Sequence, residues 1–151
     1  MKLDVYFIDA FADKVFTGNP AAVIFTDIDD EKLMQKIASE NNLSETAFVN
    51  LTKDTNYIRW FSPLKEVDLC GHATLASGFV YFNFINKDEN EVTFMSASGE
   101  LSVKRNDDLY ELNFPKDNLI KIDLKDQVED SIGVKPIETY IGDINLFAIL
   151  D

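Results

Sequence analysis

The chain has 151 residues, of which 46% are hydrophobic and 27% charged, proportions that are ordinary for a globular protein with one well-formed core. Its 27 acidic residues outnumber 14 basic ones and give a net charge of −13, which argues against nucleic acid and against anionic membranes as partners. A single cysteine excludes an intrachain disulfide, and the N-terminus has no signal-peptide pattern, so we expect a cytoplasmic protein.

Two strands are expected at the start of the chain. Apolar residues that alternate with their neighbours predict a mostly buried strand over residues 3–8. The triplet Gly18-Asn19-Pro20 is a turn signal, and the apolar run over residues 21–25 predicts a second strand after it.

The next segment predicts a helix followed by two paired strands. Apolar residues at the i, i+3, i+4 spacing indicate an amphipathic helix from about Glu31 to Asn41, with Asp29 or Asp30 as its cap. Strands are then expected over residues 45–51 and 57–61, paired around a polar turn.

A second helix, from roughly Leu69 to Asn83 with Asp68 as its cap, is apolar on all sides. Such a helix must be wrapped by other elements, and we expect Phe79 and Phe82 to be buried on opposite sides of it. The strands before it provide part of the wrapping, and further strands are expected at residues 91–95, 99–104 and 109–114. The pattern predicts an α+β fold in which a strongly curled, barrel-like and mostly antiparallel sheet surrounds a central helix.

The last part of the chain predicts a smaller segment. An exposed acidic helix is expected over residues 123–131, ended by Gly133, and the apolar run over residues 137–150 predicts one strand. We therefore expect a helix-wrapped domain over residues 1–116. Residues 117–151 would hold a linker helix and the first strand of an incomplete second domain.

Glu45 is the candidate acid/base residue. In the strand that it begins, it shares a face with Ala47 and Val49, because side chains alternate along a strand. A carboxylate in line with an apolar face is costly to ionise, which is the setting in which a glutamate works as a general acid/base. The alternative, that Glu45 lies at the open end of the strand in water, stays open at this point.

The start of the central helix is the candidate binding site for an anion. Free backbone N–H groups there attract negative charge, and Gly71 would permit close approach of a substrate carboxylate. His72, the only histidine, could orient a substrate or relay a proton near neutral pH, or be a packed residue of the helix start. Asn19 could point toward a ligand, although a turn explains this residue equally well.

Cys70 has two interpretations. A helix N-terminus lowers the pKa of a thiol, which would make Cys70 a thiolate base. The alternative is a small buried hydrophobic residue, which is the commoner role of a free cysteine. A metal site made by Cys70 and His72 fails on ligand count, since structural zinc takes about four ligands, so no metal is expected.

Several motifs occur in the order seen in one enzyme family. They are Asp9-Ala10-Phe11, Gly18-Asn19-Pro20-Ala21-Ala22-Val23, Leu43-Ser44-Glu45-Thr46-Ala47-Phe48-Val49 and Cys70-Gly71-His72-Ala73-Thr74. Phe61-Ser62-Pro63 lies where this family often has Phe-Thr-Pro or Phe-Ser-Pro. With these motifs the chain resembles the N-terminal half of the PhzF-like isomerases, which have the diaminopimelate-epimerase fold.

The resemblance implies a cofactor-free isomerase of the type found in phenazine biosynthesis. By this resemblance, Glu45 matches the glutamate that moves a proton between carbons of a small, acidic, unsaturated ring substrate, and His72 matches the active-site histidine. In the phenazine pathway that substrate is a dihydro-hydroxyanthranilate. The substrate would lie in a cleft between two similar domains, and the predicted substrate-binding residues of this chain are His72, Gly71 and Asn19.

The resemblance leaves two alternatives open. Related epimerases have a cysteine before a glycine at this helix start, so an epimerase or racemase that uses Cys70 is the second hypothesis. The family's second half is absent from the chain, which makes an inactive half-domain the third. We expect the 151 residues to be inactive alone, and we expect an unpaired strand after Tyr140 to favour a homodimer.

Overall fold

The computed structural model describes residues 2–14, 16–143 and 145–151, and the chain divides into two compact units, Met1–Pro115 and Lys116–Asp151. The first unit holds, in chain order, β1 (Tyr6–Ala10), β2 (Asn19–Phe25), α1 (Glu31–Asn41), β3 (Glu45–Leu51), β4 (Asn56–Phe61), β5 (Glu66–Val67), α2 (Gly71–Val80), η1 (Tyr81–Ile85), β6 (Glu91–Ser96), β7 (Gly99–Asn106) and β8 (Leu109–Asn113). Among the described residues, no helix has the length and apolar character that crossing a bilayer requires.

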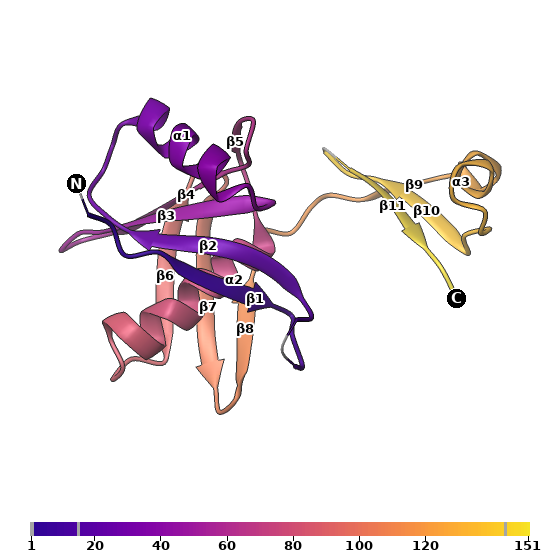
Figure 1. Cartoon of the computed structure of the whole chain (residues 1–151). Helices are drawn as coiled ribbons and strands as arrows, with labels where there is room; N and C mark the ends of the chain where they lie inside the picture. Colours follow the sequence, from indigo (N-terminus) through magenta and orange to yellow (C-terminus); the bar gives the residue numbers. More distant parts are fainter. Residues whose placement is uncertain (1, 15, 144) are drawn as a thin grey trace. The chain divides into compact units, whose positions relative to one another are not determined.

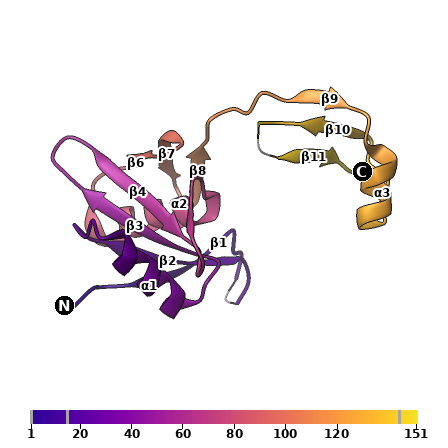
Figure 2. The same ribbon diagram turned by 90° about the horizontal axis from the view of Figure 1, so that it is seen from above.

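One sheet of eight strands makes up most of the first unit. Its described strands follow the order β1-β2-β3-β4-β6-β7-β8, and β5 pairs with β4. Neighbouring strands are antiparallel except for β2 with β3 and β4 with β6, which are parallel. Figure 1 shows this sheet curling around α2, and Figure 2 shows the same arrangement from above. The predicted α+β fold, with a curled and mostly antiparallel sheet around a central helix, is confirmed.

Strand β3 is buried on both of its faces. Ala47 and Val49 belong to the larger core, which the sheet forms with α2. Phe48 points to the opposite face and packs with Met34 and Ala38 of α1 in a smaller core. Because β3 is held from both sides, the position of Glu45 at its start is well defined.

Helix α1 begins and ends where the sequence pattern predicts. The side chain of Asp30 accepts hydrogen bonds from the backbone N–H groups of Lys32 and Leu33, at 3.0 and 3.2 Å. Asn42 ends the helix in the left-handed conformation, with φ of 50°. Of the two candidate caps, Asp30 is therefore the one that caps the helix.

Helix α2 begins two residues later than predicted. Cys70 occupies the N-cap position with extended backbone angles, φ −144° and ψ 114°, and makes no side-chain capping bond. The predicted cap at Asp68 is wrong, because the helix begins only at Gly71, and the Asp68 carbonyl accepts a hydrogen bond from Ser98 Oγ at 2.8 Å. The helix also ends earlier than predicted, since residues 81–85 form the π-helical turn η1.

The sheet wraps α2 unevenly. Phe82 is fully buried, as predicted, whereas Phe79 is only partly buried and Phe84 is 55% exposed. The reason is that β1 and β8, which lie at the two ends of the strand order, do not pair with each other in the described part of the chain. Residues of these two strands and Phe79 line a cavity of about 530 Å³ between the edges.

The first two strands also differ from the expected ranges. β1 begins at Tyr6 instead of residue 3, and Leu3 packs against the smaller core without joining the sheet. Asn19 and Pro20 lie inside β2, opposite Ala10 and Asp9 of β1. Only Gly18 of the predicted turn triplet lies outside a strand, and its φ of +89° is a conformation that favours glycine.

The second unit holds β9 (Ile120–Ile122), α3 (Lys125–Ile132), β10 (Glu138–Ile141) and β11 (Leu146–Ile149), and its three strands form an antiparallel sheet in the order β11-β10-β9. Gly133 ends α3 in the left-handed conformation, as predicted. The single strand predicted over residues 137–150 is wrong, because the Gly142 N–H bonds to the Asn145 carbonyl at 2.8 Å and closes a turn between two strands.

Candidate active site

Parallel pairing of β2 and β3 brings the first candidate residues together. Ala21 of β2 lies opposite Glu45 of β3, so Asn19 and Pro20 lie beside Ser44. The Ser44 hydroxyl oxygen is 3.5 Å from Asn19 Oδ1 and 3.4 Å from the Pro20 carbonyl oxygen. Asn19 and Pro20, which the sequence placed in a turn, therefore form one side of the candidate site.

The start of α2 faces these residues. His72 Nε2 lies 3.4 Å from Glu45 Oε2 and 3.3 Å from Ser44 Oγ. The His72 side chain is 9% exposed and that of Glu45 is 21% exposed. A carboxylate thus meets an imidazole in a largely desolvated place, with part of the carboxylate still reachable from solvent.

Cys70 lies on the other side of the imidazole. Its Sγ is 3.5 Å from His72 Nδ1, and the cysteine is buried. Burial raises the pKa of the Cys70 thiol to about 12, and the nearby Glu45 carboxylate acts in the same direction, against a lowering by the Ala73 backbone. At neutral pH the group is a thiol, so the structure does not favour Cys70 as a thiolate base.

The imidazole is also neutral near pH 7. Burial lowers the pKa of His72, and the charge of Glu45 and a hydrogen bond to the Pro20 backbone oppose this shift only in part. A neutral imidazole carries one N–H donor and one bare nitrogen acceptor. It can therefore orient a neighbouring carboxylate or pass on a proton.

Gly71 fits tightly at the start of α2. A Cβ atom at this position would lie 2.8 Å from Cζ of Phe114, so a larger residue would have to displace this partly exposed ring. The predicted role of Gly71 in admitting a substrate carboxylate stays a prediction. The first turn of α2 has no side-chain capping bond, and the start of a helix attracts an anion.

One group of three possible metal ligands occurs in the part of the chain that the structure describes. The ligand atoms of Glu45, Cys70 and His72 all lie within 4.8 Å of one another. Zinc binds cysteine as the thiolate, which the raised pKa of Cys70 disfavours, and structural sites use about four ligands. The group fits acid/base chemistry better than it fits a metal.

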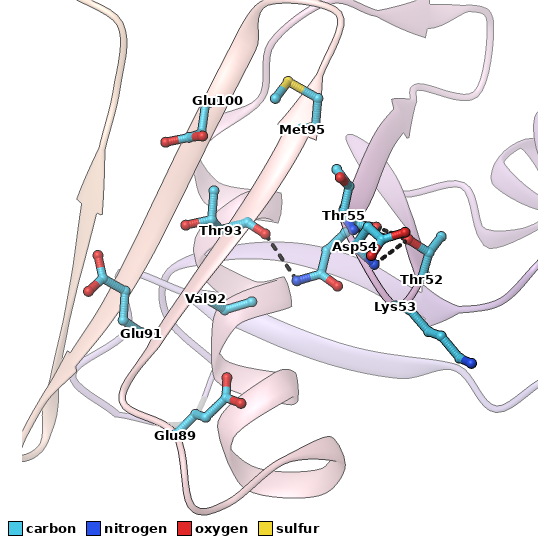
Figure 3. A pocket seen from close by; sticks show the side chains of 11 residues that line it. Thr52, Lys53, Asp54, Thr55, Glu89, Glu91, Val92, Thr93, Met95 and Glu100 are labelled. Atoms are coloured by element: carbon cyan, nitrogen blue, oxygen red, sulfur yellow. Dashed lines mark hydrogen bonds between the residues drawn. The ribbon is translucent and has the colours of Figure 1, made fainter.

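A separate cavity of about 300 Å³ lies between the β3–β4 connection and the β6–β7 hairpin (Figure 3). The carboxylates of Asp54, Glu89, Glu91 and Glu100 line it, and Lys53 is the one cation among its lining residues. Such a surface repels an anionic substrate. None of Glu45, Cys70 and His72 lines this cavity, so we place the candidate site at the three converging acid/base groups.

Three of the four residues predicted for catalysis or substrate binding converge through side-chain contacts: Glu45 and His72 touch directly, and Asn19 is linked to them by Ser44. The sequence analysis named Ser44 only within a family motif and missed the Pro20 carbonyl altogether. A backbone carbonyl has no signal in the residue pattern. Only the pairing of β2 with β3 reveals it.

Comparisons with known proteins place the chain in a family. The family model for phenazine biosynthesis-like proteins, PhzC-PhzF, matches residues 8–135. An uncharacterised isomerase of Pseudomonas aeruginosa is 44% identical over 154 residues, which cover 100% of this chain and 59% of the relative. The chain therefore spans less than two thirds of the length of this relative.

Comparison with solved structures leads to the same family. A PhzF-family protein of Enterococcus faecalis superposes with a TM-score of 0.89 and is 44% identical, over 100% of this chain and 58% of that one. A predicted epimerase of Pseudomonas aeruginosa superposes with a TM-score of 0.70 over 92% of this chain and 56% of that one. At 22% identity, this second similarity concerns the fold alone.

Proposed function

The chain belongs to the phenazine biosynthesis-like PhzC-PhzF family, and we propose that it provides the acid/base part of a cofactor-independent isomerase that moves a proton on a small carboxylate-bearing substrate. The observation that carries this proposal is the contact between the Glu45 carboxylate and the neutral imidazole of His72, at 3.4 Å and largely buried. The names of relatives support the class of reaction, since the Pseudomonas aeruginosa relative is called an isomerase.

Glu45 acts in this proposal as base and then as acid. Its carboxylate takes a proton from one substrate carbon, so that a C–H bond breaks and an O–H bond forms. The same O–H then delivers the proton to a second carbon, which regenerates the carboxylate and leaves an isomer of the substrate. His72 orients Glu45, and the uncapped N–H groups at the start of α2 bind the substrate carboxylate.

The Cys70 epimerase hypothesis is less well supported. A two-base epimerase that used Cys70 would need a thiolate at neutral pH, whereas burial raises the pKa of this thiol to about 12. The likeness to a predicted epimerase concerns the fold and adds no chemistry. We therefore retain the glutamate-based reaction as the proposed function.

The test follows the transferred proton. Because this chain spans 58% of the Enterococcus faecalis structure, the assay uses the chain joined to the segment of that protein beyond the match, hereafter the joined protein. The joined protein is incubated in D₂O with a dihydro-hydroxyanthranilate, and NMR follows isomer formation and deuterium at carbon. We expect isomerisation, with turnover reduced roughly 10²-fold or more in the Glu45→Gln variant.

Two control measurements accompany this test. Binding of the aromatic hydroxyanthranilate, which has the carboxylate but no proton to move, should be nearly unchanged in Glu45→Gln. The exposed Glu40→Gln variant removes the same charge from α1 and should leave turnover unchanged. Near-normal turnover in a folded Glu45→Gln variant would refute the proposed role.

A further inference from the structure

The proposed reaction leaves Cys70 unused, although this residue touches the imidazole of His72. Cys70 Sγ lies 3.5 Å from His72 Nδ1, and the cysteine is 7% exposed. The thiol is buried, contacts a ring nitrogen and lies at the start of the helix that carries the site. These features indicate a more specific role than filling space.

The surroundings of Nε2 identify the nitrogen that carries the ring proton. Glu45 Oε2, at 3.4 Å, can only accept a hydrogen bond when ionised. The Ser44 hydroxyl has its own acceptors in the Pro20 carbonyl and Asn19 Oδ1, so it can donate to one of them and accept from Nε2. Since acceptors surround Nε2, the proton belongs there, and Nδ1 is the bare nitrogen.

A bare Nδ1 in a buried place needs a donor. Within the described residues, the Cys70 sulfur is the one side-chain partner of Nδ1. An unpaired buried acceptor is destabilising, and a thiol hydrogen directed at it removes most of this cost. The thiol keeps its hydrogen at neutral pH, because burial raises its pKa to about 12.

We propose that the Cys70 thiol donates its hydrogen to His72 Nδ1 and thereby holds the imidazole neutral, with its Nε2–H directed at Glu45. Cys70 is then a positioning residue that acts through His72 and does not touch the substrate. The catalytic consequence rests on the proposed function, but the contact and its effect on His72 do not. No bond to carbon forms or breaks at the sulfur.

The groups that act on the imidazole come from three places. Glu45 on β3 is its charged neighbour, and Cys70 is its titratable neighbour at the start of α2. From the β2 side come the uncharged Pro20 carbonyl and, through Ser44, the Asn19 amide. The Glu45 carboxylate also raises the pKa of the thiol, so it competes with Nδ1 for the thiol hydrogen. The experiment must separate these two acceptors.

The sequence suits a direct measurement, because His72 is its only histidine. In protein labelled with ¹⁵N-histidine, the two ring signals report which nitrogen carries the proton and at which pH the ring is protonated. We expect the 151-residue chain to show the Nε2–H form at neutral pH. A ring with its proton on Nδ1 would overturn the proposal without the need for any variant.

Variants of Cys70 then test the donor. Cys70→Ala removes the hydrogen bond that favours the neutral ring, so the proton affinity of His72 should rise roughly 3- to 10-fold. Cys70→Ser keeps a hydrogen-bond donor, so the proton affinity of His72 in this variant should stay close to that in the parent chain. Val80→Ala opens a cavity in the same core at the far end of α2, and it should leave the titration of His72 unchanged.

An unchanged titration in Cys70→Ala would show that the thiol donates to Glu45 instead, and would overturn the proposal. In the joined protein, Cys70→Ala should move the acid side of the pH–turnover profile to higher pH, and Cys70→Ser should restore it. If Glu45→Gln keeps full turnover, the proposed function fails while the NMR result still decides the thiol contact. The two hypotheses therefore fail separately.

Discussion

A buried neutral histidine makes folding sensitive to pH in a defined window. Burial lowers the pKa of His72 below its ordinary value of 6.5, so the unfolded chain binds this proton more readily than the folded one. Above pH 6.5 both states are neutral at this residue, and it adds no pH dependence. As the pH falls from 6.5 toward the folded-state pKa, the unfolded state gains protons first and stability decreases.

We therefore predict that the melting temperature falls between pH 7 and pH 5 and that the fall is smaller in His72→Gln. Among the described groups with shifted pKa values, only His72 titrates in this window, since Asp126 and Glu138 are shifted downward from ordinary acidic values. Thermal unfolding followed by circular dichroism at half-unit pH steps measures the difference. Equal falls in both proteins would mean that His72 is not buried in the neutral form.

At the residue scale, the strand pattern identified Glu45 but not its partner. Alternation along residues 45–51 placed Glu45 in line with Ala47 and Val49, and those two side chains do lie in the core around α2. The contact with His72 joins residues 27 positions apart and depends on how far the sheet curls. Curvature arises from the packing of several strands together, so no local pattern contains it.

At the element scale, the cap of α1 offers a matched comparison. The Asp30 side chain accepts two backbone hydrogen bonds, whereas Asp29 makes only a 3.8 Å ion pair with Arg59 and is 94% exposed. We predict that Asp30→Ala lowers the free energy of unfolding by about 1 kcal/mol and that Asp29→Ala changes it by much less. Chemical denaturation measures both, and equal effects would show that charge, not capping, matters here.

Close packing of α2 on the sheet gives a second prediction. A Cβ atom at Gly78 would lie 2.5 Å from Cγ1 and 2.7 Å from Cβ of Val103 on β7, so an added methyl must push the helix away. Gly78→Ala should cost about 1–3 kcal/mol of stability. The same substitution should cost less in a Val103→Ala background, where the 2.5 Å contact with Cγ1 is gone, although the 2.7 Å contact with Cβ remains. Denaturation of the four proteins of this double-mutant cycle tests the contact, and additive effects would contradict it.

The ends of a helix could be predicted where a hydrogen bond between residues close in sequence determines them. They could not be predicted where a hydrogen bond to a residue far along the chain does. α1 matched because Asp30 caps its own helix. α2 did not match, because the Asp68 carbonyl is used by Ser98 of the β6–β7 connection, 30 residues away. The run over residues 137–150 hid a turn, because apolar residues continue on both sides of Gly142 and Asp143.

At the scale of the whole molecule, the second unit has little core of its own. Ile120, Ile141 and Leu146 lie in one row across β9, β10 and β11, and their exposed fractions are 66%, 46% and 50%. β9 and β11 are also edge strands within the described residues. An exposed apolar row on a sheet with free edges favours association with another chain.

The last prediction combines this surface with the partly exposed Glu45. We predict that the 151-residue chain alone is inactive and associates into dimers or larger species. The joined protein defined above should be active and should associate less. Proton transfer by Glu45 needs a site closed to water, in which substrate and carboxylate are held in a fixed geometry. With 21% of its side chain exposed, Glu45 in this chain alone stays in contact with solvent. Sedimentation velocity and turnover of a dihydro-hydroxyanthranilate, measured on both proteins at the same concentration, provide the comparison. Equal turnover per site from a monomeric 151-residue chain would show that residues 1–151 already contain everything the reaction requires.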